Sequence, residues 1–273
     1  MILDDIVAYK TEFVAHRRRE VSLADVVAMA RDTPAPAGGA LFGAAIARKR
    51  GGDVNVIAEV KKASPSKGII REDFDPVAIA ATYAAHGAAA ISVLTDEAFF
   101  QGHLDFLRAV AAETSATPLL RKDFTIDEYQ IHEARAAGAA AILLIAGILD
   151  RHQLVGFREL AAGLGMDTLT EVHLEAEADL AAELGAPVMG INNRDLRDFS
   201  VDLGRTGRIV EMLGGAGKGI VFVAESGIST PADVERVRAV GVDAILVGES
   251  LMRQCDPGVA LAALMARPEP PEE

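Results

Sequence analysis

The chain alternates between short apolar segments and amphipathic segments, and this alternation constrains its fold more than any other feature. Eight apolar segments begin at residue 54, and each is followed by a stretch with helical periodicity. The predicted strands are residues 54–60, 89–94, 118–121, 140–145, 168–171, 188–192, 220–224 and 244–247. The predicted helices that follow them are residues 75–86, 103–113, 126–137, 150–163, 174–184, 205–213, 230–240 and 257–266.

A weak internal repeat supports the alternation. The segments HGAAAISV, AGAAAILL, LGAPVMGI and VGVDAILV each end a helix at a glycine and then open a strand; these glycines are Gly87, Gly138, Gly185 and Gly241. Near-continuous apolar strands are typical of a parallel sheet covered on both faces. Eight such units within residues 51–266 predict an α/β fold, a closed (β/α)8 TIM barrel. The alternative is an open doubly wound sheet, but no G-x-G-x-x-G follows the first strand.

The predicted barrel accounts for most of the chain, with one extension and one tail. We expect residues 1–50 to form a helical extension packed on the barrel, with helices over 4–19, 22–31 and 41–49. Residues 51–266 form the barrel itself. Residues 267–273 are rich in Pro and Glu, a composition that predicts disorder.

Composition excludes several classes of function. A net charge of -13 argues against a nucleic-acid partner, although a local cationic pocket can still bind a small anion. The chain has no apolar run of membrane-spanning length and no signal-peptide start, so we expect a soluble cytoplasmic protein that does not bind membranes. The single cysteine, Cys255, excludes an internal disulfide and a cysteine zinc cluster. The histidines lack metal-ligand spacing, so we expect no metal site.

Charged and polar side chains recur at the carboxyl ends of the predicted strands. Glu59 and Lys61 lie two residues apart at the end of the first strand, so both project from one face of it. The second, third, fifth, sixth and seventh strands end in Ser92 and Thr95, Lys122, Glu171, Asn192 with Arg194, and Glu225 with Ser226, whereas the fourth ends in apolar residues. In a barrel these ends border one mouth. Burying charges costs on the order of several kcal/mol per ion, so a functional site explains the set better than isolated structural ion pairs.

Two glycine turns predict a phosphate site at the same mouth. Ser226 and Gly227 follow the seventh strand and Gly248 follows the eighth, where a short extra helix begins near Glu249. The last two loops of such barrels, together with an extra helix, commonly hold phosphate. The alternative is that the glycines only permit tight turns. Ser64 can reach the same anion from the long loop 62–73, which can act as a lid.

Seven segments, in order and across nearly the whole chain, resemble the motifs of the indole-3-glycerol phosphate synthase family. They are IAEVKKASPSKG, ISVLTDEAFFQG, LLRKDF, LTEVH, GINNRDL, VAESGI and ILVGESLM. The resemblance implies a small phosphorylated substrate, 1-(2-carboxyphenylamino)-1-deoxyribulose 5-phosphate. The implied carboxy-lyase reaction closes the indole ring with loss of carbon dioxide and water. It implies no cofactor and no metal, and we expect no fused pathway enzyme in this chain.

The resemblance also implies roles for individual residues. Lys122 is expected to be the general acid and Glu171 the general base. Lys61 is expected to hold the substrate carboxylate, and can itself be the acid in one step, while Glu59 orients Lys61 or Lys122. Asn192 and Arg194 are expected to contact the hydroxyls and the carboxylate of the substrate, and Glu225 is expected to fix the lysines. The phosphate is expected to be held by Ser64, Ser226, Gly227 and Gly248. The apolar walls are expected to come from Phe99 or Phe100, Phe124, Leu143 and Leu196. Glu249 is expected to turn its side chain away from the phosphate.

Two other functions fit a barrel of this kind. A phosphate-binding isomerase, such as phosphoribosylanthranilate isomerase, would use a cysteine and an aspartate at the mouth, and Cys255 lies beyond the last strand. A catalytically silent barrel that binds a metabolite or a protein does not need the set formed by Glu59, Lys122 and Glu171. Both are therefore disfavoured.

Overall fold

Eight parallel strands close into a barrel in the computed structural model, which describes residues 2–34, 42–48, 52–114, 116–195, 199–215 and 219–266. The strands are β1 (Asn55–Val60), β4 (Ala90–Leu94), β5 (Leu119–Lys122), β6 (Ala141–Ile145), β7 (Asp167–Val172), β8 (Val188–Asn192), β9 (Val221–Glu225) and β10 (Ala244–Val247). Each is hydrogen-bonded to its neighbours in chain order, and β1 pairs with β10 to close the ring. The predicted fold class is confirmed, and every predicted strand is present with ends within one residue.

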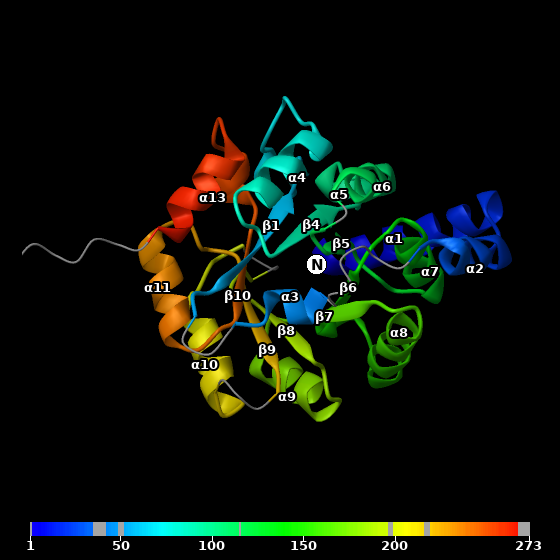
Figure 1. Cartoon of the computed structure of the whole chain (residues 1–273). Coiled ribbons are helices and arrows are strands. Elements are labelled where there is room, and N and C mark those ends of the chain that lie inside the picture. The colour runs from blue at the N-terminus through cyan, green and yellow to red at the C-terminus, as the bar shows by residue number, and fades with distance from the viewer. Residues whose placement is uncertain are drawn as a thin grey trace, which may run out of the picture.

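Helices surround the strands, as Figure 1 shows. They are α4 (Pro76–Ala85), α6 (Leu104–Glu113), α7 (Glu128–Ala136), α8 (Arg151–Gly163), α9 (Glu175–Glu183), α10 (Gly204–Met212), α11 (Pro231–Ala239) and α13 (Pro257–Met265). The repeated glycines Gly87, Gly138, Gly185 and Gly241 all have positive φ, between 73 and 97°. Their left-handed backbone ends each helix and turns the chain into the next strand, as the repeat predicted.

Several short elements lie in the loops that follow the strands. The loop after β1 contains a small antiparallel hairpin, β2 (Ala63–Ser64) with β3 (Gly68–Ile69), which the sequence did not predict. Also unpredicted are α5 (Glu97–Phe100) and a 3-10 turn over Ala146–Ile148. The short extra helix predicted near Glu249 is present as α12 (Glu249–Met252).

Three helices precede the barrel: α1 (Ile2–Glu20), α2 (Leu23–Asp32) and α3 (Phe42–Ile46). In Figure 1, α1 runs outward from the N-terminus, which lies over the middle of the barrel, and α2 lies outside the helical ring beside α7, which it contacts extensively. Helix α1 buries positions four residues apart, Ile6, Lys10 and Val14, so a lysine occupies the centre of its inward stripe. The predicted tail at 267–273 and part of the predicted extension lie outside the described residues.

Helix α3 closes the amino-terminal end of the barrel. Phe42 and Ile46 are fully buried and pack into the interior cluster together with Ile57. The backbone N–H of Gly43 donates to the carboxylate of Asp167 at the start of β7, 2.7 Å away. Ile6 of α1 belongs to the same interior cluster. Residues before the barrel therefore complete its core. Among the described helices, none is both long and apolar enough to span a membrane.

Truncation of Phe42 to alanine should destabilise the protein strongly. The ring fills the closed end of the barrel and has no exposed area, so its loss leaves a cavity that costs about 3–5 kcal/mol of unfolding free energy. Urea unfolding monitored by circular dichroism measures the change. Met29→Ala is the control because Met29 is half exposed on α2, and it should change the free energy by less than about 0.5 kcal/mol. Equal effects would show that α3 does not complete the core.

Candidate active site

A cavity of about 560 Å³ opens at the carboxyl ends of the strands. Thirteen of the fourteen site residues predicted from the sequence line it. They are Glu59, Lys61, Ser64, Lys122, Phe124, Leu143, Glu171, Asn192, Arg194, Glu225, Ser226, Gly227 and Gly248. The fourteenth, Leu196, lies outside the described residues. Because these side chains come from almost every strand, the parallel register of the barrel is what brings them together.

The centre of the cavity is a lysine between two carboxylates. The Lys122 ammonium, at the end of β5, lies 2.8 Å from Glu171 Oε2 on β7 and 3.4 Å from Glu225 Oε2 on β9. The side-chain amide of Asn192 donates to Glu171 Oε1 at 3.1 Å. Both carboxylates are almost fully buried. Strands β5, β7 and β9 therefore each contribute one member of a compact charged group, and Asn192 at the end of β8 fixes the orientation of Glu171.

The charges in this group set each other's protonation. Burial alone would lower the pKa of Lys122, but the carboxylates of Glu171, Glu225 and Glu59 outweigh it and raise that pKa. Burial would raise the pKa of Glu171, yet Lys122 lowers it to about 2. Burial and the nearby Glu171 raise the pKa of Glu225 to about 8, against the opposing pull of Lys122. At neutral pH the group thus contains one ammonium, one carboxylate and one neutral carboxylic acid.

A second ion pair joins Glu59 and Lys61 of the first strand end, with 2.5 Å between Glu59 Oε1 and Lys61 Nζ. Of the two lysines that Glu59 was expected to orient, the direct contact is to Lys61. Two glycines make room for the carboxylates. A Cβ at Gly190 would overlap Glu225 Oε1, and one at Gly248 would approach Glu59 Oε1 to 2.6 Å. Gly248, predicted for phosphate, therefore also accommodates Glu59.

Loops at the ends of β9 and β10 form the polar side of the cavity. Ser226 and Gly227 have positive φ of 66 and 80°, and Gly248 is the N-cap of α12. The buried hydroxyl of Ser64 has no hydrogen-bond partner within the described part of the chain. Ser229 and Ser250, which the sequence analysis missed, line the same side. These groups form a hydroxyl-rich and glycine-rich rim.

Arg194 points toward this rim. Its guanidinium lies 3.6 Å from Glu249 Oε2, while Arg253 lies 3.2 Å from the other oxygen of that carboxylate. The acidic side chain beside the predicted phosphate site is therefore offset by two arginines. Arg194 also donates to the backbone carbonyl of Phe199 at 3.4 Å.

The apolar side of the cavity combines barrel residues with helix α1. Phe100 and Phe124 line it with ring centroids 6.1 Å apart, together with Leu143. Leu3 and Ile6 of α1 also line it. Of the alternatives Phe99 and Phe100, only Phe100 is a lining residue, because Phe99 packs edge-on against Tyr9 at 5.7 Å. The sequence analysis did not predict that α1 would reach the cavity.

The sequence analysis missed two polar residues near Lys122 and Glu171. His173 Nε2 lies 3.3 Å from Glu171 Oε1. Asp123, directly after Lys122, is buried and lines the cavity. His173 lies two residues beyond Glu171, the same spacing that linked Glu59 to Lys61, and that spacing was the available signal. Among the described residues, no cluster of three or more His, Cys, Asp or Glu side chains is arranged to hold a metal ion.

A sequence profile described as indole-3-glycerol phosphate synthase matches residues 3–264. The chain belongs to the indole-3-glycerol phosphate synthase family. It is 49% identical over 266 residues to the indole-3-glycerol phosphate synthase of Laribacter hongkongensis, covering 97% of this chain and 99% of the relative. It is 51% identical over 269 residues to the synthase of Leptothrix cholodnii, with coverage of 97% and 99%.

Solved structures outside this family share the barrel alone. Thiamine phosphate pyrophosphorylase from Pyrococcus furiosus is similar with a TM-score of 0.57 at 20% identity, covering 77% of this chain and 93% of that one. The 3-hexulose-6-phosphate synthase of Salmonella typhimurium has a TM-score of 0.58 at 12% identity, covering 78% and 98%. At these identities the likeness concerns the fold.

The raised pKa of Glu225 gives a test based on stability. With a pKa near 8 in the folded protein against an ordinary value of 4.5, the native state binds more protons than the unfolded state between those pH values. This contribution to stability is fully present below pH 4.5 and is lost as pH rises through about 8. Replacing Glu225 with glutamine should therefore remove part of the decline in unfolding free energy between pH 5 and pH 9.

Urea unfolding at several pH values measures this difference between wild type and E225Q. The control is Glu183→Gln, because Glu183 lies on the surface and pairs with the exposed Arg151. Parallel pH profiles for wild type and E225Q would contradict a neutral, buried Glu225.

Proposed function

We propose that this cavity converts 1-(2-carboxyphenylamino)-1-deoxyribulose 5-phosphate to indole-3-glycerol phosphate. The observation that carries the proposal is the Lys122 ammonium between Glu171 and Glu225, inside a cavity with an aromatic wall and a hydroxyl-rich rim. The carboxylate-bearing ring carbon bonds to the ketone carbon, and carbon dioxide leaves from that ring carbon. The former ketone oxygen then leaves as water, which completes the indole.

Lys122 is the general acid in this proposal. As the ring carbon attacks, negative charge develops on the ketone oxygen, and a buried ammonium stabilises it and supplies the proton. The carboxylates that raise the pKa of Lys122 keep it protonated before the substrate reacts. An ammonium held by fixed partners also needs little reorganisation during the reaction.

Glu171 is the general base, and Lys122 controls when it acts. The charge of Lys122 holds the pKa of Glu171 at about 2, which makes the carboxylate a weak base in the resting protein. Once Lys122 gives its proton to the substrate, that charge is gone and the pKa of Glu171 rises. Glu171 therefore becomes a stronger base at the dehydration step, when a proton must be removed.

The remaining residues bind and orient the substrate. Lys61, which forms an ion pair with Glu59, pairs with the substrate carboxylate in this proposal, and it can supply a proton in one of the two steps. Asn192 fixes Glu171 and faces the sugar hydroxyls. Backbone and hydroxyl groups at Ser64, Ser226, Gly227 and Gly248 hold the phosphate, while Phe100, Phe124 and Leu143 contact the aromatic ring. A phosphorylated substrate does not cross membranes, so we propose that the protein acts in the cytoplasm.

The cavity disfavours the isomerase alternative. Cys255 is exposed and is absent from the residues that line the cavity, so it cannot act as an acid or base there. Incubating the purified protein with the carboxyphenylamino substrate and following indole fluorescence tests the proposed function. Formation of the indole product supports it, and absence of fluorescence from folded protein at saturating substrate contradicts it.

Replacing Lys122 with methionine should abolish most turnover. The variant loses the proton donor and the stabilising charge, so kcat should fall by about 10²–10⁴-fold. Inhibition by inorganic phosphate should change little, because the phosphate rim is formed by other strands. Lys67→Met is the control, since Lys67 is exposed in the β2–β3 turn. Near-normal turnover by K122M would exclude Lys122 as the general acid.

Replacing Glu171 with glutamine should slow the chemical steps more than binding. Glutamine keeps the size of the side chain and can still contact Asn192, but it cannot accept the proton, so the single-turnover rate should fall by about 10²–10⁴-fold. Rapid-quench measurements at saturating substrate test this, with the exposed Glu211→Gln as control. A single-turnover rate equal to that of wild type would count against Glu171 as the base.

A further inference from the structure

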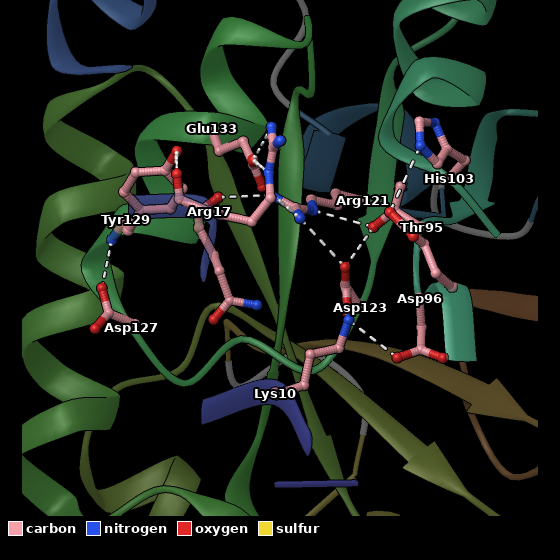
Figure 2. Close-up of polar contacts among 12 residues, drawn as sticks. Lys10, Arg17, Thr95, Asp96, His103, Arg121, Asp123, Asp127, Tyr129 and Glu133 are labelled. Atoms are coloured by element: carbon pink, nitrogen blue, oxygen red, sulfur yellow. Dashed lines mark hydrogen bonds and ion pairs between the residues drawn. The ribbon is translucent and has the colours of Figure 1, made fainter. Parts of the chain in front are cut away.

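A buried lysine outside the catalytic group joins two loops of the cavity. Lys10 of α1 has no exposed area. Its ammonium lies 2.9 Å from Asp96 Oδ2 and 2.7 Å from Asp123 Oδ1, and both carboxylates are buried (Figure 2). Burial would lower the pKa of Lys10, but Asp123 and Asp96 outweigh it and raise that pKa. The proposed mechanism does not use this charge, so it needs another explanation.

Each carboxylate that contacts Lys10 also fixes one aromatic wall of the cavity. Asp96 caps α5, because its Oδ1 accepts hydrogen bonds from the backbone N–H groups of Phe99 at 2.7 Å and Phe100 at 3.2 Å. Asp123 Oδ1 accepts from the backbone N–H of Phe124 at 2.8 Å. Phe100 and Phe124 both line the cavity, on the side opposite the rim where the third described aromatic lining residue, Phe199, accepts from Arg194. Lys10 therefore bridges the loop after β4 and the loop after β5 at the base of both rings.

The bridge is part of a larger network with balanced charge. Arg121 lies 3.2 Å from Asp123 and 2.8 Å from Glu133, and Arg17 of α1 contacts Glu133 at 3.3 Å (Figure 2). The three cations Lys10, Arg17 and Arg121 thus face the three buried carboxylates Asp96, Asp123 and Glu133, and Arg17 also pairs with the exposed Glu20. Without the charge of Lys10, one carboxylate is left in excess, and Asp96 and Asp123 lose the cation that lies between them.

We propose that Lys10 is a positioning residue that sets the spacing of the Phe100–Phe124 wall, by drawing the carboxylates of Asp96 and Asp123 together from helix α1. The same face of α1 carries Leu3 and Ile6, which line the cavity directly. Helix α1 therefore contributes both surface and alignment to the aromatic side of the cavity. This inference rests on the proposed function, because the wall is assigned there to the aromatic ring of the substrate.

The first test compares binding at the two sides of the cavity. In Lys10→Met, the loops after β4 and β5 lose the cation that they share, so Phe100 and Phe124 are no longer held at their native spacing. The affinity for anthranilate should therefore fall about tenfold to a hundredfold, the range expected when a positioning group is displaced slightly. The inhibition constant of inorganic phosphate should stay within about twofold, since that rim lies on β9 and β10. Isothermal titration with each ligand, and KM against kcat for the full substrate, give the readouts. KM should rise more than kcat falls.

A matched control separates alignment from simple docking of α1. Arg18 also joins α1 to the barrel, through a 2.6 Å ion pair with Asp127, but it contacts neither Asp96 nor Asp123. Arg18→Met should leave anthranilate affinity within about twofold, because its partly exposed contacts with Asp127, Glu128 and the Tyr129 ring contribute little and none of them reaches the aromatic wall. Equal loss of anthranilate affinity in K10M and R18M would overturn the inference, as would an equal loss of phosphate affinity in K10M.

A second variant keeps the test decisive if K10M does not fold. Lys10→Met combined with Asp96→Asn restores the charge balance, and the asparagine oxygen can still accept from Phe99 and Phe100. This double variant should fold, bind phosphate normally and bind anthranilate more weakly than wild type. Wild-type anthranilate affinity in the double variant would overturn the inference even while wild type turns over its substrate. If the wild-type protein did not turn over the substrate, the proposed function would be contradicted instead. The two outcomes can be told apart because the binding comparison does not depend on turnover.

Discussion

The ion pair between Lys122 and Glu171, with Glu225 beside it, is the interaction on which the site depends. Two buried carboxylates and one ammonium cannot all be charged at low cost, so the group settles with one proton on Glu225. The ionised carboxylate of Glu171 keeps the Lys122 ammonium charged, and that ammonium keeps Glu171 a weak base until its proton passes to the substrate. Protonation of each member is set by the other two, which makes the three residues one functional unit.

The barrel supplies the geometry that this unit needs. Parallel strands deliver β5, β7 and β9 side chains to one mouth, and Gly190 on β8 leaves the space that the Glu225 carboxyl fills. Residues before the barrel serve both of its ends. Phe42 closes the amino-terminal end, while Lys10, Leu3 and Ile6 of α1 reach the catalytic end. The amino-terminal helices are therefore part of the core and of the cavity.

Much of this arrangement was predictable from local sequence. Strand ends were predicted within one residue because apolar runs and the repeated glycines mark them, and the polar residues at those ends follow from the strand direction. Lys10 was not predicted, because a lysine within an amphipathic helix normally lies on the solvent face. Its partners Asp96 and Asp123 are distant in sequence, and only the packed structure shows that they meet. The room that Gly190 on β8 leaves for the Glu225 carboxyl on β9 also depends on packing between strands.

The central claim concerns the protonation of two carboxyl groups, and carbon-13 NMR of protein labelled at the glutamate side-chain carboxyls measures it directly. The account predicts that one buried carboxyl, Glu225, titrates near pH 8, while Glu171 remains ionised down to about pH 2. If both carboxyls titrated together near the ordinary glutamate pKa of 4.5, the lysine would not be coupled to them as described, and the proposed timing of acid and base would be wrong.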